Sequence, residues 1–533
     1  MYYSNGDDTS GPQIMLKFSL LVLLCLLTSC IEGVSRPCVL KDYGREHRVC
    51  VCNATYCDII YKVQTINKDE FLSFISSKDG LRFNRTNGKL SNNSGLPLPQ
   101  ASSPRTTVSF TVKPGKKYQK IMGFGGAFTD AAGINIKSLS KMAQENLMRS
   151  YFSEHGIEYN LCRLPISGTD FSTHPYSYDD GTPDPQLSRF ALAQEDLEYK
   201  IPLIQWAKNM SEKEIHLVAA SWSPPPWMKT NNDYAGFAFL KEEYYDLYSK
   251  YLLRFLDEYK KRDVNIWAMS TGNEPSNGIL PIKRFNSLGW TPISVTNWTV
   301  NYFGPQLRNS IHNDTILLAF DDQRLFLPWW INLMVRADKR ILEYINGFAV
   351  HWYWDFLIGA KVINDLHENY PEKFTLYTEA SVGDKPWEKK VDIGSWERGE
   401  MYIADIIQNL NAWVTGWLDW SLALDTTGGP SWAKNQVDSP ILVNSSADEF
   451  YRQPMFYAMG HASKFVERGG VRLQVSPTVT RDVHATAVQN PDGRIVIIML
   501  NKNTVSVQVS VEIGGKGWVN MELPARSFAT ILC

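Results

Sequence analysis

The sequence has almost no excess of charge of either sign. Its 533 residues carry 54 Lys and Arg against 56 Asp and Glu, which gives a formal net charge of −2. No long run of Lys or Arg interrupts that balance, so the chain lacks the electrostatic footprint of a nucleic-acid-binding protein. We therefore expect no nucleic-acid partner.

Long hydrophobic runs are nearly absent as well. The clearest one extends from Phe18 to Leu27, behind Lys17 and ahead of a stretch of small residues. It is too short to span a bilayer comfortably, so we interpret residues 1–35 as a secretory signal peptide rather than a membrane anchor. An acidic stretch ahead of this run leaves two candidate starts, Met1 and Met15.

Cysteine is scarce outside the N-terminal region. Of eight cysteines, two fall in the predicted signal peptide and four lie together in "CVLKDYGREHRVCVCNATYC". Cys50 and Cys52 are too close to pair with each other without strain, so we expect two disulfides that staple a small N-terminal subdomain. An exported chain favours this reading over a zinc site. Cys162 and Cys533 are left over, and Cys162 reads as a buried core thiol.

Sequons of the type Asn-x-Ser/Thr are spread along the chain. A single sequon often occurs by chance, but in an exported chain we expect several to be glycosylated and therefore to lie on the surface. The sequon residues are Asn53, Asn84, Asn92, Asn209, Asn297, Asn313 and Asn444.

Against these absences, the chain is rich in apolar and aromatic residues. They make up 44% and 12% of the sequence, and 17 residues are Trp, which is enough for a large core. Short apolar runs alternate with longer amphipathic stretches such as residues 239–262, where apolar positions recur at helical spacing. Eight such runs predict a (β/α)8 barrel, with its active site at the carboxyl ends of the strands. The runs are 121–126, 159–165, 215–221, 264–270, 315–320, 345–351, 374–379 and 412–420.

The segments on either side of the barrel read differently. They hold apolar residues at period two, which is typical of strands with one buried face. We expect them to pair into an immunoglobulin-like β-sandwich beside the barrel. The predicted domains are the signal peptide (1–35), a small three-stranded antiparallel β subdomain (36–63 plus 422–453), the β-sandwich (64–118 plus 470–533) and the barrel (119–421 plus 454–469).

Polar or aromatic residues follow the apolar runs, as the barrel rule demands of a site. Loops are polar in any protein, so the repeated placement carries more weight than any single residue. Asp321 and Asp322 together suggest a metal, but no second acidic cluster supports one. The residues are Asp130, Arg163, Asp170, Trp222, Asn273, Glu274, Asp321, Asp322, His351, Trp352, Tyr353, Glu379, Asp419 and Trp420.

Two of these residues form a pair with obvious chemistry. Glu274 and Glu379 end the fourth and seventh strands, which face each other across the mouth of a barrel. Two carboxyl groups without a metal cluster suit glycoside cleavage, in which one protonates the leaving oxygen and the other attacks the anomeric carbon. A purely structural reading, with Glu379 as a helix cap and Glu274 in a salt bridge, is the alternative. We expect no metal and no organic cofactor.

The motifs around these residues resemble one known family. "STGNEPS" looks like the Asn-Glu-Pro signature of retaining glycosidases with (β/α)8 barrels. Together with eight further motifs it is similar to glycoside hydrolase family 30, and specifically to its glucosylceramidases. Those motifs are "CVCNATYC", "GFGGAFTDAA", "YNLCRLPISGTDFS", "SWSPPPWMKTN", "DDQR", "VHWYWDF", "TEASVG" and "GWLDWSLAL".

The resemblance implies a role for each matching residue. Glu274 matches the acid/base, Glu379 the nucleophile, and Asn273 the amide that binds the sugar 2-hydroxyl. Arg163 matches a cation beneath the carboxylates, while His351 and Tyr353 match a pair beside the nucleophile. The glucose-binding set matches Asp170, Trp222, Trp420 and Asn435. The same family pairs Cys38 with Cys50 and Cys52 with Cys57.

The resemblance also implies a function. It predicts a retaining β-glucosidase that hydrolyses glucosylceramide at a membrane surface in the lysosome, helped by a saposin-type activator and working at acidic pH. Thr271, Gly272 and the loop 279–290 depart from the family pattern, which leaves the aglycone open. The alternatives are a β-glycosidase or transglucosidase acting on β-xylosides or glucosylsterols, and an inactive sugar-binding protein. The oligomeric state stays open.

Overall fold

The computed structural model describes residues 1–2, 36–63, 65–95 and 106–533. The predicted signal peptide lies outside the described residues except for its first two. The chain divides into two units, Met1–Pro37 and Cys38–Cys533, and the fold below is that of the second. No helix within the described ranges has the length and apolar character needed to cross a bilayer.

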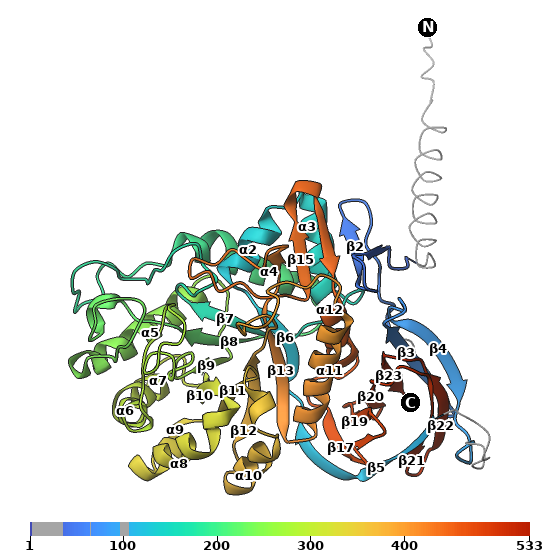
Figure 1. The fold of residues 1–533 in the computed structure, drawn as a ribbon. Coiled ribbons are helices and arrows are strands. Elements are labelled where there is room, and N and C mark those ends of the chain that lie inside the picture. The colour runs from blue at the N-terminus through green and yellow to red at the C-terminus, as the bar shows by residue number, and fades with distance from the viewer. Residues whose placement is uncertain (3–35, 64, 96–105) are drawn as a thin grey trace. The chain divides into compact units, whose positions relative to one another are not determined.

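Eight parallel strands close into a barrel, which confirms the predicted fold class (Figure 1). The fourth strand is shorter than the predicted 264–270. The chain turns at Asp263, which has a φ of +58°, and the Val264 N–H then donates to the Tyr259 carbonyl at the end of the preceding helix at 3.1 Å. The strands are β6 (Gly123–Ala127), β7 (Leu161–Ile166), β8 (His216–Ser221), β9 (Ala268–Ser270), β10 (Ile316–Gln323), β11 (Gly347–His351), β12 (Phe374–Glu379) and β13 (Val414–Ser421).

The inside of the barrel is a packed apolar layer. One residue from most strands points inward and is fully buried, and a second layer of partly buried side chains closes the amino-terminal end. Gly125 shows how tightly β6 and β7 approach, because a Cβ there would lie 1.7 Å from the Leu161 carbonyl oxygen. The lower barrel is therefore a plug, and only its carboxyl end is open to polar chemistry. The inward layer is Leu161, Val218, Ala268, Leu318, Ala349, Leu376 and Leu418.

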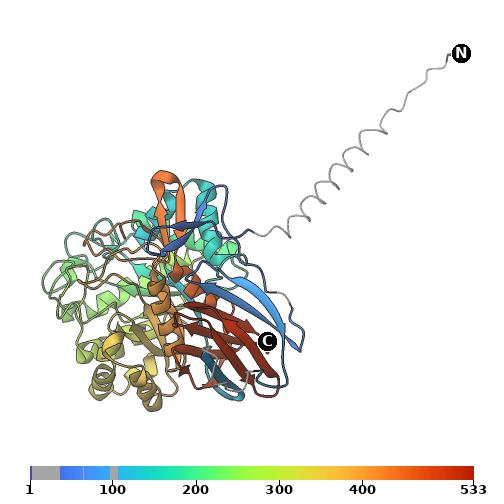
Figure 2. The ribbon, with the colours of Figure 1, turned by 45° about the vertical axis from the view of Figure 1, so that its right-hand side comes forward.

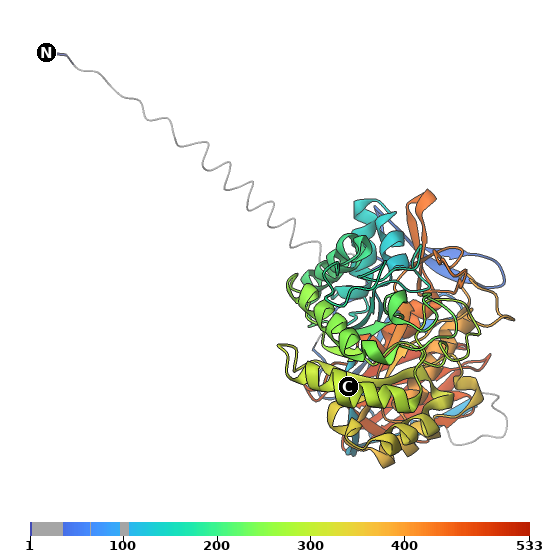
Figure 3. The same ribbon diagram turned by 90° about the vertical axis from the view of Figure 1, so that its left-hand side faces the viewer.

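Helices wrap the barrel between its strands, and those of the middle of the chain cover the side that faces the viewer in Figure 3. The predicted amphipathic stretch 239–262 contains α5, which buries its apolar face. The helices are α2 (Asp130–Lys137), α3 (Lys141–Phe152), α4 (Ile201–Met210), α5 (Tyr245–Lys260), α6 (Pro292–Trp298), α7 (Gly304–Arg308), α8 (Leu327–Ala337), α9 (Ile341–Tyr344), α10 (Lys361–Asn369), α11 (Trp396–Leu410) and α12 (Pro454–Ser463).

A second sheet pairs the early and late segments of the chain, as predicted (Figure 2). The long strand β5 pairs with β21 through its first half and with β17 through its second, so the sheet turns over on itself and encloses its own apolar core. The strand order is β22 (Gly517–Leu523), β21 (Val507–Ile513), β5 (Thr106–Lys120), β17 (Val471–Ser476), β19 (Val483–Gln489), β20 (Ile495–Asn501), β23 (Ser527–Leu532), β3 (Glu70–Ser77) and β4 (Asn84–Lys89), with β18 (Val479–Thr480) paired to β19.

The small N-terminal sheet has five strands, so the predicted three-stranded antiparallel sheet was wrong in its number of strands. The antiparallel centre is as expected, but a short strand is added at each edge, and β14 runs parallel to β15 because it continues directly from the barrel strand β13. The order is β1 (Leu40–Asp42), β2 (Arg48–Asn53), β16 (Glu449–Arg452), β15 (Ile441–Asn444) and β14 (Leu424–Asp425).

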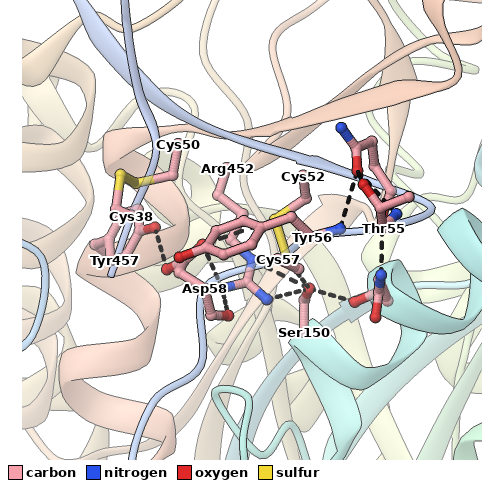
Figure 4. The surroundings of a disulfide bond; sticks show 12 residues. Cys38, Cys50, Cys52, Thr55, Tyr56, Cys57, Asp58, Ser150, Arg452 and Tyr457 are labelled. Carbon is pink, nitrogen blue, oxygen red and sulfur yellow. Dashed lines mark hydrogen bonds and ion pairs between the residues drawn. A yellow bond between two sulfur atoms is a disulfide. The ribbon is translucent and has the colours of Figure 1, made fainter. Parts of the chain in front are cut away.

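Two disulfides staple this sheet, Cys38–Cys50 and Cys52–Cys57, and they confirm the expected pairing over a zinc site. Beside the second disulfide, Arg452 on β16 lies 3.0 Å from Asp58 and donates to the Ser150 hydroxyl on α3 (Figure 4). The ion pair ties the segment after the second disulfide to β16, and the bond to Ser150 ties β16 to the barrel helix α3. Cys162 and Cys533 are free and buried.

Candidate active site

A pocket of about 890 Å³, part of it open to solvent, lies at the carboxyl end of the barrel. It is lined by residues from the loops after β7, β8, β9, β10, β11, β12 and β13, which is where the barrel rule places a site. Eight of the predicted site residues line it: Asp170, Trp222, Asn273, Glu274, Tyr353, Glu379, Trp420 and Asn435. Arg163 and His351 are fully buried beneath them.

The two predicted catalytic carboxylates meet in this pocket. One carboxylate oxygen of Glu274 lies within 4.8 Å of one from Glu379. Glu379 is the last residue of β12, whereas Glu274 follows β9 in a left-handed conformation with a φ of +42°. That strained conformation is held by a hydrogen bond of 2.9 Å from the Glu274 N–H to the Asp321 carbonyl.

Arg163 organises the floor of the pocket from β7. Its guanidinium donates to Asn273 Oδ1 at 2.8 Å, to Asp321 Oδ2 at 2.7 Å and to Glu379 Oε2. The Trp222 and Trp420 rings lie 4.9 and 5.6 Å from it. Because Arg163 only donates, the Asn273 oxygen must face it, which leaves the Asn273 amide nitrogen free to donate into the pocket.

His351 lies between two carboxylates. Its Nδ1 is 3.0 Å from Glu274 Oε1 and its Nε2 is 3.0 Å from Asp321 Oδ1. Burial alone would lower the pKa of His351, but the charge of Glu379 and these two hydrogen bonds outweigh burial and raise the pKa to about 10. His351 is therefore an imidazolium that donates from both nitrogens.

The surroundings of Glu379 have opposite effects on its pKa. Burial raises the pKa of Glu379, whereas the positive charges of His351 and Arg163 lower it, and the net direction is upward. The Tyr353 hydroxyl donates to Glu379 Oε1 at 2.6 Å. Both oxygens of Glu379 thus accept a hydrogen bond from a fixed donor, which suits the ionised form.

Glu274 Oε1 accepts a second hydrogen bond, of 2.7 Å, from Gln323. The opposite end of that amide, Gln323 Oε1, is buried in the pocket wall without a protein partner among the described residues. Sequence reasoning gave Gln323 no role. The available signal was its place at the end of β10, inside the quoted motif "DDQR".

Asp321 and Asp322 both belong to this hydrogen-bond network. Burial would raise the pKa of Asp321, but the charge of Arg163 and the hydrogen bonds from His351 and Thr378 outweigh burial and hold this pKa well below its ordinary value. Asp322 binds the Ser276 N–H at 2.8 Å, and burial together with the charge of Glu274 raises its pKa to about 7. Glu274, His351 and Glu379 approach closely enough for a cation, but both His351 nitrogens are engaged with carboxylates.

One part of the pocket lining combines aromatic faces with a carboxylate and an amide. Trp222 and Trp420 stack on each other at 5.1 Å between ring centres, and Phe171 packs edge-on against Trp420. Beside them, Asn435 Nδ2 donates to Asp170 Oδ2 at 2.8 Å. Indole faces next to a carboxylate and an amide can stack on a sugar ring and bind its hydroxyls. The remaining predicted strand-end residues Asp130, Trp352 and Asp419 lie outside the pocket lining and are buried.

The mouth of the pocket is apolar. Leu280 and Ile282 line it while remaining 67% and 68% exposed, and Phe326 and Trp354 line it too, with their rings 5.5 Å apart. Such exposed apolar side chains around an opening are typical of a surface that receives an apolar ligand. Leu280 and Ile282 belong to the loop 279–290, which departs from the family pattern.

Comparison with known proteins supports the geometry. Residues 121–466 match the glycosyl hydrolase family 30 TIM-barrel domain, and residues 469–531 match the family 30 beta sandwich domain. The chain is 41% identical to lysosomal acid glucosylceramidase of Mus musculus over 93% of this chain and 96% of the relative. It is 38% identical to putative glucosylceramidase 4 of Caenorhabditis elegans over 92% and 93%.

A solved structure is similar as well. SrfJ from Salmonella typhimurium superposes with a TM-score of 0.78 and 28% sequence identity, over 87% of this chain and 99% of that chain. The likeness therefore extends beyond the barrel, which alone makes up a smaller share of the chain.

Proposed function

The chain belongs to glycoside hydrolase family 30, and from this premise we propose that it is a retaining β-glucosidase that hydrolyses glucosylceramide to glucose and ceramide. The observation that carries the proposal is the approach of Glu274 and Glu379 to within 4.8 Å between carboxylate oxygens. Retaining enzymes hold their carboxyl groups about 5–5.5 Å apart, and inverting enzymes hold them farther apart to admit a water molecule.

In the first step, Glu274 protonates the leaving oxygen while Glu379 attacks the anomeric carbon. Glu274 Oε1 already accepts from His351 and Gln323, so the proton resides on Oε2. Three carboxylates, Glu274, Asp321 and Glu379, surround two cations, so the cluster is neutral when one of the three carries a proton. Both oxygens of Glu379 accept from Arg163 and Tyr353, and Asp321 accepts from Arg163 and His351, which leaves Glu274 to carry it.

In the second step, a water molecule hydrolyses the glucosyl ester on Glu379. Esterification removes the negative charge of Glu379, so Glu274 releases its proton more readily and serves as the base for that water. The Asn273 amide nitrogen, left free by the bond from Arg163 to its oxygen, donates to the sugar 2-hydroxyl. Tyr353 and Arg163 hold the two oxygens of Glu379 in place before the attack.

Asp170 and Asn435 bind the other hydroxyls of the glucose, and the Trp222 and Trp420 rings provide the apolar wall of the same subsite. The lipid leaves through the mouth of the pocket, which is lined by Leu280 and Ile282 and by the aromatic pair Phe326 and Trp354. That apolar rim supports a lipid substrate drawn from a membrane surface. The working place that we propose is the lysosome, reached by export through the predicted signal peptide, with glycans on several sequons and a saposin-type activator as partner.

The decisive test is to trap the covalent intermediate with a 2-deoxy-2-fluoro β-glucoside and to find the adduct by mass spectrometry. We expect a sugar on the peptide that contains Glu379 and none in Glu379→Gln, whose turnover of a fluorogenic β-glucoside falls by roughly 10⁴-fold or more because no ester forms. An adduct on another peptide would refute the assignment of Glu379. Unlabelled but active protein would refute the retaining mechanism.

A second candidate substrate follows from the divergent loop 279–290. Because Leu280 and Ile282 of this loop line the mouth, the leaving group is the part of the substrate that it would select, and a glucosylsterol is the alternative to glucosylceramide. Rates on both lipids, on a β-xyloside and with an added alcohol acceptor separate hydrolysis of glucosylceramide from the other activities. A faster rate on the β-xyloside would overturn glucose as the preferred sugar. An inactive sugar-binding protein is disfavoured because both carboxylates are in place.

A further inference from the structure

Lys283 reaches into the pocket from the loop after β9. Its ammonium donates to Asn435 Oδ1 at 2.8 Å and to the Asp384 carbonyl oxygen at 2.9 Å. The side chain thereby connects the loops that follow β9, β12 and β13 across one wall of the pocket, which all three residues line. Both acceptors are uncharged oxygens, so neither hydrogen bond is an ion pair.

The bond from Lys283 fixes the orientation of the Asn435 amide. A lysine ammonium can only donate, so the Asn435 oxygen must face Lys283. The Asn435 nitrogen is then turned to Asp170, where it donates to Oδ2 at 2.8 Å. Lys283, Asn435 and Asp170 form a relay in which each hydrogen bond sets the direction of the next.

Asp170 needs such a relay because its surroundings oppose its charge. Burial, together with the nearby carboxylates Glu379 and Glu274, raises the pKa of Asp170 to about 7, while Asn435 and Lys283 act in the opposite direction. An ionised Asp170 accepts hydrogen bonds from sugar hydroxyls. A protonated Asp170 would instead donate one, and the Asn435 oxygen would be its natural acceptor if the Asn435 amide were free to turn over, which the bond from Lys283 opposes.

We propose that Lys283 is a specificity-determining positioning residue, which turns the oxygen of Asn435 away from Asp170 so that the Asn435 nitrogen donates to the Asp170 carboxylate and favours its ionised, hydroxyl-accepting form. The inference rests on the proposed function and deepens it, since it says how the glucose subsite is oriented.

The test compares Lys283→Met with Lys283→Arg on a soluble fluorogenic β-glucoside at pH 5 and pH 7.5. We expect kcat/KM of Lys283→Met to fall roughly 10-fold to 100-fold at pH 5, chiefly through KM, because one charged hydrogen bond and the acceptor it protects are lost. At pH 7.5 the loss is smaller, because a larger fraction of Asp170 is ionised there in both proteins and the two fractions differ less than at pH 5. Lys283→Arg keeps a donor and a charge, so it retains most of the activity.

Two further variants separate the relay from general damage. Lys389→Met makes the same change at an exposed lysine that pairs with Asp392, and it should leave kcat/KM unchanged. In an Asn435→Ala background, Lys283→Met should cost little more, because the relay is already broken. An equal loss at both pH values, or an undiminished loss in Asn435→Ala, would overturn the inference. Wild-type turnover with Lys283→Met unaffected would do the same, whereas inactive wild-type protein would refute the proposed function itself.

Discussion

His351 at the mouth of the barrel and His461 on α12 are both fully buried, yet they are held in opposite charge states. For His351, neighbouring carboxylates overcome burial and raise the pKa to about 10. For His461, which lies where α12 packs against both the barrel and β23, burial lowers the pKa to about 3. Burial is common to the two residues and cannot explain the difference.

The difference lies in the partners. His351 has a carboxylate on each nitrogen, whereas His461 has the hydroxyls of Thr530 and Ser76, both at 2.9 Å, and packs against the Phe83 ring at 4.7 Å. A buried histidine next to charges stores a proton that the chemistry of a site can use, and one next to hydroxyls is a neutral packing element. The two regions can therefore be told apart by what breaks when each histidine is changed.

The largest expected contrast is in turnover. His351→Gln should lower kcat/KM about 100-fold, because an imidazolium held by Glu274 and Asp321 is worth two charged hydrogen bonds of about 1.5–3 kcal/mol each and a glutamine replaces only part of them. His461→Gln, assayed per folded molecule, should retain wild-type kcat/KM. Similar losses of kcat/KM in the two variants would mean that the surroundings of His351 and those of His461 do not differ in function.

Acidification should separate the two regions in stability. The folded pKa of His461 lies below that of the unfolded chain, so the unfolded state takes up a proton first as the pH falls from about 6.5 toward 3. The unfolding free energy should fall over that window by up to about 1.4 kcal/mol per pH unit from this group, and His461→Gln should remove that slope. Urea unfolding at pH 7 and pH 5 measures it, and parallel losses in wild type and variant would contradict the prediction.

Alkaline pH should act on His351 with the opposite sign. Its folded pKa of about 10 lies above the unfolded value, so its contribution to stability is complete below about pH 6.5 and is lost as the pH rises toward 10. In that window the folded state holds one proton more than the unfolded state, so the unfolding free energy should fall by up to about 1.4 kcal/mol per pH unit from this group. Urea unfolding between pH 7 and pH 9 should show this slope in wild type and its absence in His351→Gln.

The barrel, the sandwich and both carboxylates were open to prediction because they depend on local pattern. Apolar runs at regular spacing gave the strands, and the ends of the fourth and seventh strands gave Glu274 and Glu379. Strand limits were less accessible, since β9 begins only after the turn at Asp263, and the edge strand β14 is a continuation of β13.

The charge states of the two histidines and the hydrogen bonds within the pocket could not be predicted, because they arise between segments that are distant in sequence. Lys283 and Asn435 are 152 positions apart in sequence, and Gln323 meets Glu274 across 49. The sequence separates His351 from His461 by its place at the end of a predicted strand, but it does not give the charge state of either histidine. Their difference exists only once β3, β23 and α12 pack together.

The smallest expected effect concerns one hydroxyl beside His461. Thr530 donates to the His461 carbonyl at 2.8 Å, so its oxygen accepts from His461 Nδ1, and the ring is therefore protonated at Nδ1. Thr530→Val keeps the shape but leaves that N–H without an acceptor, which should cost about 1–2 kcal/mol of unfolding free energy without changing kcat/KM. Thr504→Val, at an exposed threonine between β20 and β21, is the matched control and should cost less than about 0.5 kcal/mol. Equal costs in the two variants would show that the hydroxyl at 530 is not what keeps His461 neutral.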